Sequence, residues 1–155
     1  QSKFADYIMI MAYNEHYYGT DAGPTASLPY VQQGVTDSLN LMSADQLILG
    51  IPFYTRLWSQ TTGDASTLTS ETISMSKALE LVSENNADMI WDDELGQHYA
   101  QYEKDGKTYM IWVEDTQSID AKLKIYSNSG IAGAAYWKYG LESEGTWDVI
   151  AEYFR

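Results

Sequence analysis

Three short apolar stretches recur along the chain, and each ends in aromatic or polar residues. They span residues 7–13, 47–54 and 130–137. Runs with so few polar residues inside them are typical of strands that are buried on both faces in a parallel sheet. Parallel α/β sheets carry their chemistry at the carboxyl ends of the strands, so we expect the functional side chains where these stretches end.

The segments between these stretches show helical periodicity instead. Apolar residues at helical spacing predict helices at 30–42, 74–85, 116–128 and 146–154. The predicted apolar face consists of Val31, Val35, Leu39 and Met42 in the first of them, and of Trp147, Ile150, Ala151 and Phe154 in the last. Residues 7–54 therefore predict a strand–helix–strand unit that is long enough for a right-handed parallel crossover.

Two polar segments interrupt this alternation, and both are predicted to be loops. Residues 14–29 are rich in turn-forming residues, and residues 59–70 are polar with little hydrophobicity. A loop as long as 14–29 in a compact domain is usually functional.

The pattern after residue 58 predicts a different architecture. Its elements are, in order, the helix at 74–85, a short strand at 88–91 and two hairpin arms at 98–103 and 108–113. The dipeptide Asp105-Gly106 between the arms is a strong signal of a tight hairpin turn. Because antiparallel pairing departs from the strand–helix rhythm, we expect an inserted α+β subdomain at 59–113, flanked by two parts of one α/β unit at 1–58 and 114–155.

Composition narrows the class of protein and of partner. The chain has 155 residues, of which 45% are hydrophobic and 20% charged, which is typical of a globular domain. The net charge of −13 makes nucleic acid and anionic membranes unfavourable partners. Without cysteine there are no disulfides or thiolate nucleophiles, which fits a secreted bacterial protein and a cytoplasmic one equally well.

The aromatic residues are mostly amphipathic. There are 13 Tyr and 5 Trp against 3 Phe. Such rings pack with their polar tips in water, and they also serve as stacking platforms for sugar rings. Composition alone leaves both interpretations open.

The ends of the apolar stretches carry motifs that resemble a known family. Met11-Ala-Tyr13-Asn14, Gly50-Ile-Pro-Phe-Tyr54 and Gly133-Ala-Ala-Tyr-Trp137 resemble the ends of the sixth, seventh and eighth strands of glycoside hydrolase family 18, which includes chitinases and related N-acetylglucosaminidases. Residues 112–118 resemble the end of the family's α+β insertion. The segment at 14–16 resembles the bacterial branch that acts on spore-cortex peptidoglycan or related cell-wall glycans.

This resemblance implies a fold and a location. The fold would be the last three β/α units of a TIM (β/α)8 barrel, with an inserted α+β subdomain of the chitinase-insertion type. The protein would be secreted, or associated with the cell wall or spore of a bacterium, and would act on a glycan that contains N-acetylglucosamine.

The resemblance also implies roles for individual residues. In this family the substrate's own N-acetyl oxygen acts as the nucleophile, in a retaining mechanism. The Tyr13 hydroxyl would hydrogen-bond that oxygen as charge develops. Trp137 would form the floor under the reacting sugar, and Tyr54 and Arg56 would line the cleft. We expect Tyr13, Tyr54 and Trp137 to converge at one end of the sheet, each partly accessible to solvent. Asn14 stands where many members have Asp, so it keeps hydrogen bonding but carries no charge.

Other polar residues near the motifs have simpler explanations beside the functional ones. Met11 and Glu15 belong to the expected substrate site, and Glu15 is either a general acid or, more simply, a solvated or loop-capping carboxylate. His16 and His98 stand alone without ligand spacing, so no metal or other cofactor is expected. Glu114 and Asp115 are most simply part of a solvated face or a helix cap.

One departure from the family is large. The hallmark Asp-x-x-Asp-x-Asp-x-Glu, which supplies the catalytic acid, is absent. The resemblance therefore implies a C-terminal fragment whose partner is the missing N-terminal part of the barrel. We expect this fragment to be inactive alone and to self-associate through its open sheet. Two alternatives stay open: a non-catalytic, chitinase-like carbohydrate-binding module, and an interaction module whose exposed Tyr and Trp form a patch on the insertion.

Overall fold

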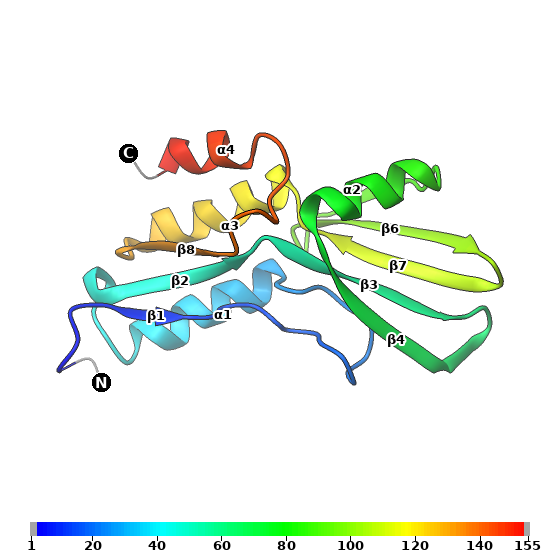
Figure 1. Cartoon of the computed structure of the whole chain (residues 1–155). Coiled ribbons are helices and arrows are strands. Elements are labelled where there is room, and N and C mark those ends of the chain that lie inside the picture. The colour runs from blue at the N-terminus through cyan, green and yellow to red at the C-terminus, as the bar shows by residue number, and fades with distance from the viewer. Residues whose placement is uncertain (1–2, 154–155) are drawn as a thin grey trace.

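Figure 1 shows the computed structural model of the chain, in which residues 3–153 are described. Two sheets follow one another along the length of the molecule. The parallel sheet contains β1 (Ile8–Ile10), β2 (Leu47–Pro52) and β8 (Gly133–Trp137), in the order β1-β2-β8. The antiparallel sheet contains β3 (Tyr54–Thr61), β4 (Asp64–Ser74), β5 (Met89–Asp92), β6 (Gln97–Lys104) and β7 (Lys107–Val113), in the order β4-β3-β7-β6-β5.

Helices connect and cover these strands. In the described part of the chain they are α1 (Leu28–Leu39), the 3-10 turn η1 (Ala44–Gln46), α2 (Met75–Glu84), α3 (Thr116–Ser129) and α4 (Thr146–Tyr153). The predicted α/β class and the parallel order of the three apolar strands are therefore confirmed.

The parallel sheet is covered on one face only. Ile10, Leu49 and Ala134 are aligned across the three strands and pack into a core with α1, α3 and α4. The alternate side chains point to the other face, where Met9, at 62% exposure, and Met11, at 70%, lie open to solvent. We refer to this second face as the open face.

The expectation that all three strands are buried on both faces is wrong. Every residue of β8 is partly or fully exposed, because β8 is an edge strand with one face open. The first strand, predicted at 7–13, pairs with β2 only over residues 8–10. Beyond it the backbone leaves the sheet, and Asn14 adopts a left-handed φ of 65°.

The predicted loop at 59–70 is also wrong. Its residues complete β3 and begin β4, which pair as an antiparallel hairpin that turns at Gly63, with a φ of 81°. The segment is rich in Thr and Ser, and β-branched Thr suits a solvent-exposed edge strand even though its hydropathy is low. The antiparallel sheet consequently begins at Tyr54, directly after β2.

The remaining elements lie close to their predicted positions. The hairpin of β6 and β7 turns at Asp105 and Gly106, whose φ values of 51° and 73° match the expected tight turn. In α4, Ile150 is buried as expected, whereas Ala151 is exposed. Phe154, which was assigned to the same apolar side, lies outside the described residues.

A buried polar cluster joins the end of β7 to α3 and β6. The Glu114 carboxylate accepts hydrogen bonds from Gln97 Nε2 at 2.7 Å, from Ser118 Oγ at 2.7 Å and from Lys122 Nζ at 2.9 Å. Burial raises the pKa of Glu114, and the Lys122 ammonium opposes this rise. The expectation of a solvated Glu114 is wrong, since its side chain and that of Lys122 are fully buried.

Candidate functional site

The carboxyl end of the parallel sheet carries a shallow hollow on its open face. It has a volume of about 50 Å³, and its lining comes from β1, β2, β8 and the segments that follow them. The lining residues are Met9, Ile10, Met11, Tyr13, Gly50, Ala135, Tyr136 and Trp137. Two of the predicted strand ends therefore meet here, as parallel pairing requires.

Tyr13 lies directly against β2 because residue 50 is glycine. A Cβ atom on Gly50 would stand 2.8 Å from Cε1 of Tyr13 and 3.3 Å from the Ile10 carbonyl oxygen, so any larger residue would displace the ring. Burial raises the pKa of Tyr13, so its hydroxyl stays protonated at neutral pH. Among residues 3–153 this hydroxyl has no hydrogen-bond partner and is therefore free to donate to a ligand.

Tyr54 and Asn14 form the second part of the site. The Tyr54 hydroxyl donates to Asn14 Oδ1 at 2.7 Å, and the rings of Tyr13 and Tyr54 meet edge to face with centroids 6.0 Å apart. Burial, chiefly, raises the pKa of Tyr54 to about 12. Only 5% of Tyr54 is exposed, so the expectation that this residue is partly accessible is wrong. Its position indicates a support for Asn14 and Tyr13.

Arg56 follows Tyr54 on the same face of β3, two residues along the strand. Its Nη1 atom donates to Ser70 Oγ at 3.2 Å, and its buried Nε atom has no partner among the described residues. The guanidinium charge partly opposes the rise in the Tyr54 pKa, which indicates that the two groups are close. Arg56 thus lies near Tyr54, and neither of these residues lines the hollow.

Met11 and Trp137 supply the apolar surface of the site. Trp137 is 56% exposed at the end of β8, and its carbonyl oxygen accepts from the Phe53 N–H at 2.7 Å. This bond fixes the end of β8 against the junction of β2 and β3. An exposed indole held by its own backbone is suited to stacking against an apolar ligand face.

Glu15 lies apart from this group. Its two carboxylate oxygens accept from the Ser27 backbone N–H at 2.8 Å and from the Ser27 hydroxyl at 3.0 Å. Ser27 is the N-cap of α1, so Glu15 ties the 14–29 loop to the start of that helix. These contacts favour the loop-capping interpretation of Glu15 over that of a general acid.

The two histidines also have structural partners. His16 Nδ1 lies 3.0 Å from the Asp21 carbonyl oxygen, and His98 Nδ1 lies 2.6 Å from Asp115 Oδ2. In the described part of the chain, no group of three or more His, Cys, Asp and Glu side chains is placed to hold a metal ion. None of its helices is long and apolar enough to cross a membrane.

Sequence reasoning assigned Met11, Tyr13 and Trp137 to the site, but it did not assign the other residues that line the hollow, which are Met9, Ile10, Gly50, Ala135 and Tyr136. Met9 and Ala135 lie on the same face of their strands as Met11 and Trp137, so the alternation of side chains along β1 and β8 was a signal for these two. The hollow and the adjacent Asn14 together offer a free phenol donor, a side-chain amide and an apolar floor. This arrangement therefore suits a neutral ligand that combines hydrogen-bond acceptors with an apolar face.

Comparison with known proteins agrees with this geometry. A profile of the family described as Glycosyl hydrolases family 18 matches residues 1–142. The chain is 26% identical to the uncharacterized glycosylase YvbX of Bacillus subtilis (strain 168), over 96% of this chain and 42% of that protein. It is 23% identical to the cortical fragment-lytic enzyme of the same organism, over 98% of this chain and 35% of that protein. The chain thus spans less than half of the length of these two curated relatives.

Solved structures share the fold. The C-terminal domain of a putative chitinase from Desulfitobacterium hafniense superposes with a TM-score of 0.88 at 28% identity, over 99% of this chain and 48% of that one. The Bacillus cereus spore cortex-lytic enzyme SleL superposes with a TM-score of 0.89 at 22% identity, over 99% and 36%. The α/β fold matches that of the C-terminal domain of the putative chitinase, and the chain belongs to glycosyl hydrolase family 18.

Proposed function

We propose that the chain is the C-terminal part of a family 18 glycoside hydrolase and comprises the last three β/α units of its barrel. The open face and the two unpaired edges, β1 and β8, support this arrangement because they are the surfaces on which the rest of a barrel would pack. The partner of this chain is then the N-terminal part of the same barrel. In this proposal the antiparallel sheet is an insertion, predicted at 59–113 and beginning at the strand that starts with Tyr54.

The proposed substrate is a glycan that contains N-acetylglucosamine. Two observations support it: the family, and the names of relatives, which include cortical fragment-lytic enzymes and a putative sporulation-specific glycosylase from Bacillus. These names point to peptidoglycan of the spore cortex or cell wall, and to a location in that wall or spore.

The free hydroxyl of Tyr13 is the observation that carries the proposal. It lies on the open face at the strand ends, beside the exposed ring of Trp137. In substrate-assisted, retaining catalysis the acetamido oxygen attacks the anomeric carbon while the glycosidic bond breaks and the leaving oxygen takes a proton from the acid, and Tyr13 donates a hydrogen bond to the acetamido oxygen. Trp137 and Met11 support the sugar ring, and Asn14, held by Tyr54, orients the acetamido group. The proton donor comes from outside this chain, because none of the residues that line the hollow is Asp or Glu.

The test compares Tyr13→Phe with Tyr7→Phe in the intact protein that contains this chain. Tyr7 is 62% exposed and serves as the matched loss of one hydroxyl. Removing one preorganised hydrogen-bond donor from an active site lowers kcat by about 10²–10³-fold. Hydrolysis of a chromogenic N-acetylglucosamine oligomer should fall by this factor for Tyr13→Phe alone. Equal rates for the two variants would contradict the role of Tyr13.

A second candidate is a non-catalytic carbohydrate-binding module, which the lack of a carboxylate in the hollow favours. Both candidates predict that the isolated chain releases no chromophore from the oligomer. They differ in the intact protein, which hydrolyses the oligomer in the first case and only binds it in the second.

A further inference from the structure

The far edge of the antiparallel sheet carries a groove outside the site described above. Two hollows, of about 440 Å³ and 530 Å³, meet there and share Ile90 and Tyr99 as common lining residues. The groove follows β5 and β6, whereas Tyr54 and Arg56 belong to β3, on the other side of β7. It is therefore separate from the hollow at the end of the parallel sheet.

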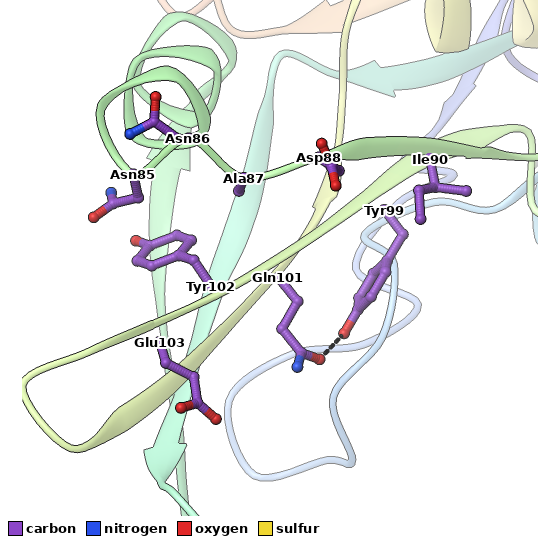
Figure 2. A pocket seen from close by; sticks show the side chains of 9 residues that line it. All are labelled: Asn85, Asn86, Ala87, Asp88, Ile90, Tyr99, Gln101, Tyr102 and Glu103. Carbon is purple, nitrogen blue, oxygen red and sulfur yellow. Dashed lines mark hydrogen bonds between the residues drawn. The ribbon is translucent and has the colours of Figure 1, made fainter.

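The groove exists because β5 is shorter than its neighbour. β5 pairs with β6 only from Met89, opposite Ala100, to Asp92, opposite Gln97. The chain reaches β5 through residues 85–88 after α2, so β6 has no partner on this side from Gln101 onward. Figure 2 shows the side chains that line the hollow of about 440 Å³ at this unpaired edge.

One face of β6 presents a row of three different groups. Tyr99, Gln101 and Glu103 alternate with inward residues, so their side chains point to the same face, as Figure 2 shows. The Tyr99 hydroxyl donates to Gln101 Oε1 at 2.7 Å. The Gln101 side-chain nitrogen and the Glu103 carboxylate have no partner among the described residues. A ring, a free amide donor and a free acceptor thus stand side by side.

The second hollow adds further aromatic surface to this row. The Tyr99 and Trp112 rings lie 4.9 Å apart at 54°, and both are half-buried. Trp91 stands nearby, with its Nε1 donating to Asp93 Oδ1 at 2.8 Å. Burial raises the pKa of Tyr99, so its hydroxyl stays a donor at neutral pH. The rings are held in place by these contacts and require little ordering on binding.

Charge and shape limit what the groove accepts. Neither hollow is lined by Lys, Arg or His, and the chain carries a net charge of −13, so anionic ligands are disfavoured. Asp92 already accepts from two backbone N–H groups and Asp93 from Trp91, which leaves Asp88 and Glu103 as the groove carboxylates without a partner among the described residues. The surface is concave, and of its rings none is fully exposed, unlike the aromatic patch expected of a protein-binding module.

We propose that this groove is a second binding site, which takes a neutral glycan chain separately from the strand-end site. The apolar face of a pyranose ring stacks on Tyr99 and Trp112, Gln101 donates to a hydroxyl or acetamido oxygen, and Glu103 accepts from a hydroxyl. The inference rests on the groove and does not require the proposed catalytic role. A polymer held at both sites would be positioned along the antiparallel sheet.

The test titrates the chain with tetra-N-acetylchitotetraose by calorimetry, and follows the tryptophan indole N–H resonances by NMR. The double variant Gln101→Ala/Glu103→Ala removes both free polar groups from exposed positions, so its fold should persist. Gln117→Ala/Glu152→Ala is the matched control, since it removes the same residue types from exposed positions on α3 and α4. Loss of two hydrogen bonds, one of them to a charged group, weakens binding by about tenfold to a hundredfold.

The expected result is a shift of the Trp91 and Trp112 resonances that the groove variant abolishes and the control variant retains. Tyr13→Phe should leave these shifts unchanged, which separates this site from the strand-end site. Shifts confined to Trp137, or equal loss in both double variants, would overturn the proposal. Binding of the glucosamine tetramer, which carries amines, without binding of the N-acetylated probe would show a cation site instead.

Discussion

The two sheets differ in how they bury their apolar side chains. The hydrophobic cluster of the antiparallel sheet draws all its buried members from residues 57–113, so this part packs on its own helix α2. The parallel sheet gathers its core from residues 12–150 and still leaves one face bare. A sheet that packs on a helix from its own segment can hold binding residues without another part of the protein, whereas the strand-end site depends on whatever covers the open face.

The largest effect is expected at the junction between the two sheets, where α3 meets the end of β7. Lys122 and Glu114 are fully buried and join α3 to the end of β7, and removing one partner leaves an unpaired buried charge. Lys122→Ala should therefore lower the free energy of unfolding by about 3–5 kcal/mol. Urea denaturation followed by circular dichroism measures this change.

The matched control is Lys124→Ala. Lys124 pairs with Asp120 on the exposed side of the same helix, and such pairs contribute about 0–1 kcal/mol. Equal losses for the two variants would mean that the buried pair does not hold the junction.

The second prediction concerns the open face. Met9 and Met11 are largely exposed there, and burying both in a contact between copies contributes about 2–4 kcal/mol. The isolated chain should self-associate at micromolar concentration, and Met9→Lys/Met11→Lys should shift it toward the monomer in light scattering. Leu41→Lys, at an exposed apolar residue outside this face, should leave the measured mass unchanged. A monodisperse wild-type monomer would contradict the prediction.

The third prediction compares two glycines. Gly50→Ala places a methyl group 2.8 Å from the Tyr13 ring, and such overpacking costs about 1–3 kcal/mol. Gly34 lies inside α1 with no atom within 4 Å of an added Cβ, so Gly34→Ala should stabilise the chain by about 0.5–1 kcal/mol. Thermal unfolding of both variants should move in opposite directions. A neutral Gly50→Ala would mean that Tyr13 does not depend on this close approach.

Much of the fold followed from local chemistry. The hairpin at Asp105-Gly106 and the cap at Asp115 depend on neighbouring residues, and both lie where the pattern put them. The prediction of a loop at 59–70 was wrong because it relied on the low hydropathy of the segment. The β-propensity of its Thr residues was the better guide, since β4 is a strand that faces water.

The site was only partly predictable, because the burial of its residues depends on contacts between distant segments of the chain. Motif positions identified Tyr13 and Trp137, which lie at the same hollow. The burial of Tyr54 and Glu114 depends on contacts between segments far apart in the sequence, such as Gln97 with Glu114. Apolar residues such as Met9 predict burial, and within the described chain no element covers them.

The smallest predicted effect contrasts two carboxylates. Glu114 is buried and its pKa is raised, whereas Glu142 is partly exposed and its pKa is lowered, first by the hydrogen bond from Trp147 Nε1 at 3.0 Å. Because the pKa of Glu142 is lowered in the folded state, the ionised carboxylate contributes its full stabilisation above the ordinary pKa of 4.5. This stabilisation is lost as the pH falls through the lowered pKa. The Trp147 indole N–H resonance should therefore titrate with a midpoint below 4.5.

Solvent screens Glu142, so this bond should barely move the unfolding midpoint, and the resonance is the sensitive readout. Glu142→Gln keeps a side-chain oxygen as acceptor but removes the titration, so the resonance should then stay constant between neutral and acidic pH. The titration should be confined to the connection between β8 and α4. The Trp112 indole N–H resonance, in the antiparallel sheet, should therefore stay constant over the same pH range. If both resonances moved together, the acid transition would be a property of the whole chain, and the two sheets would share one response to pH.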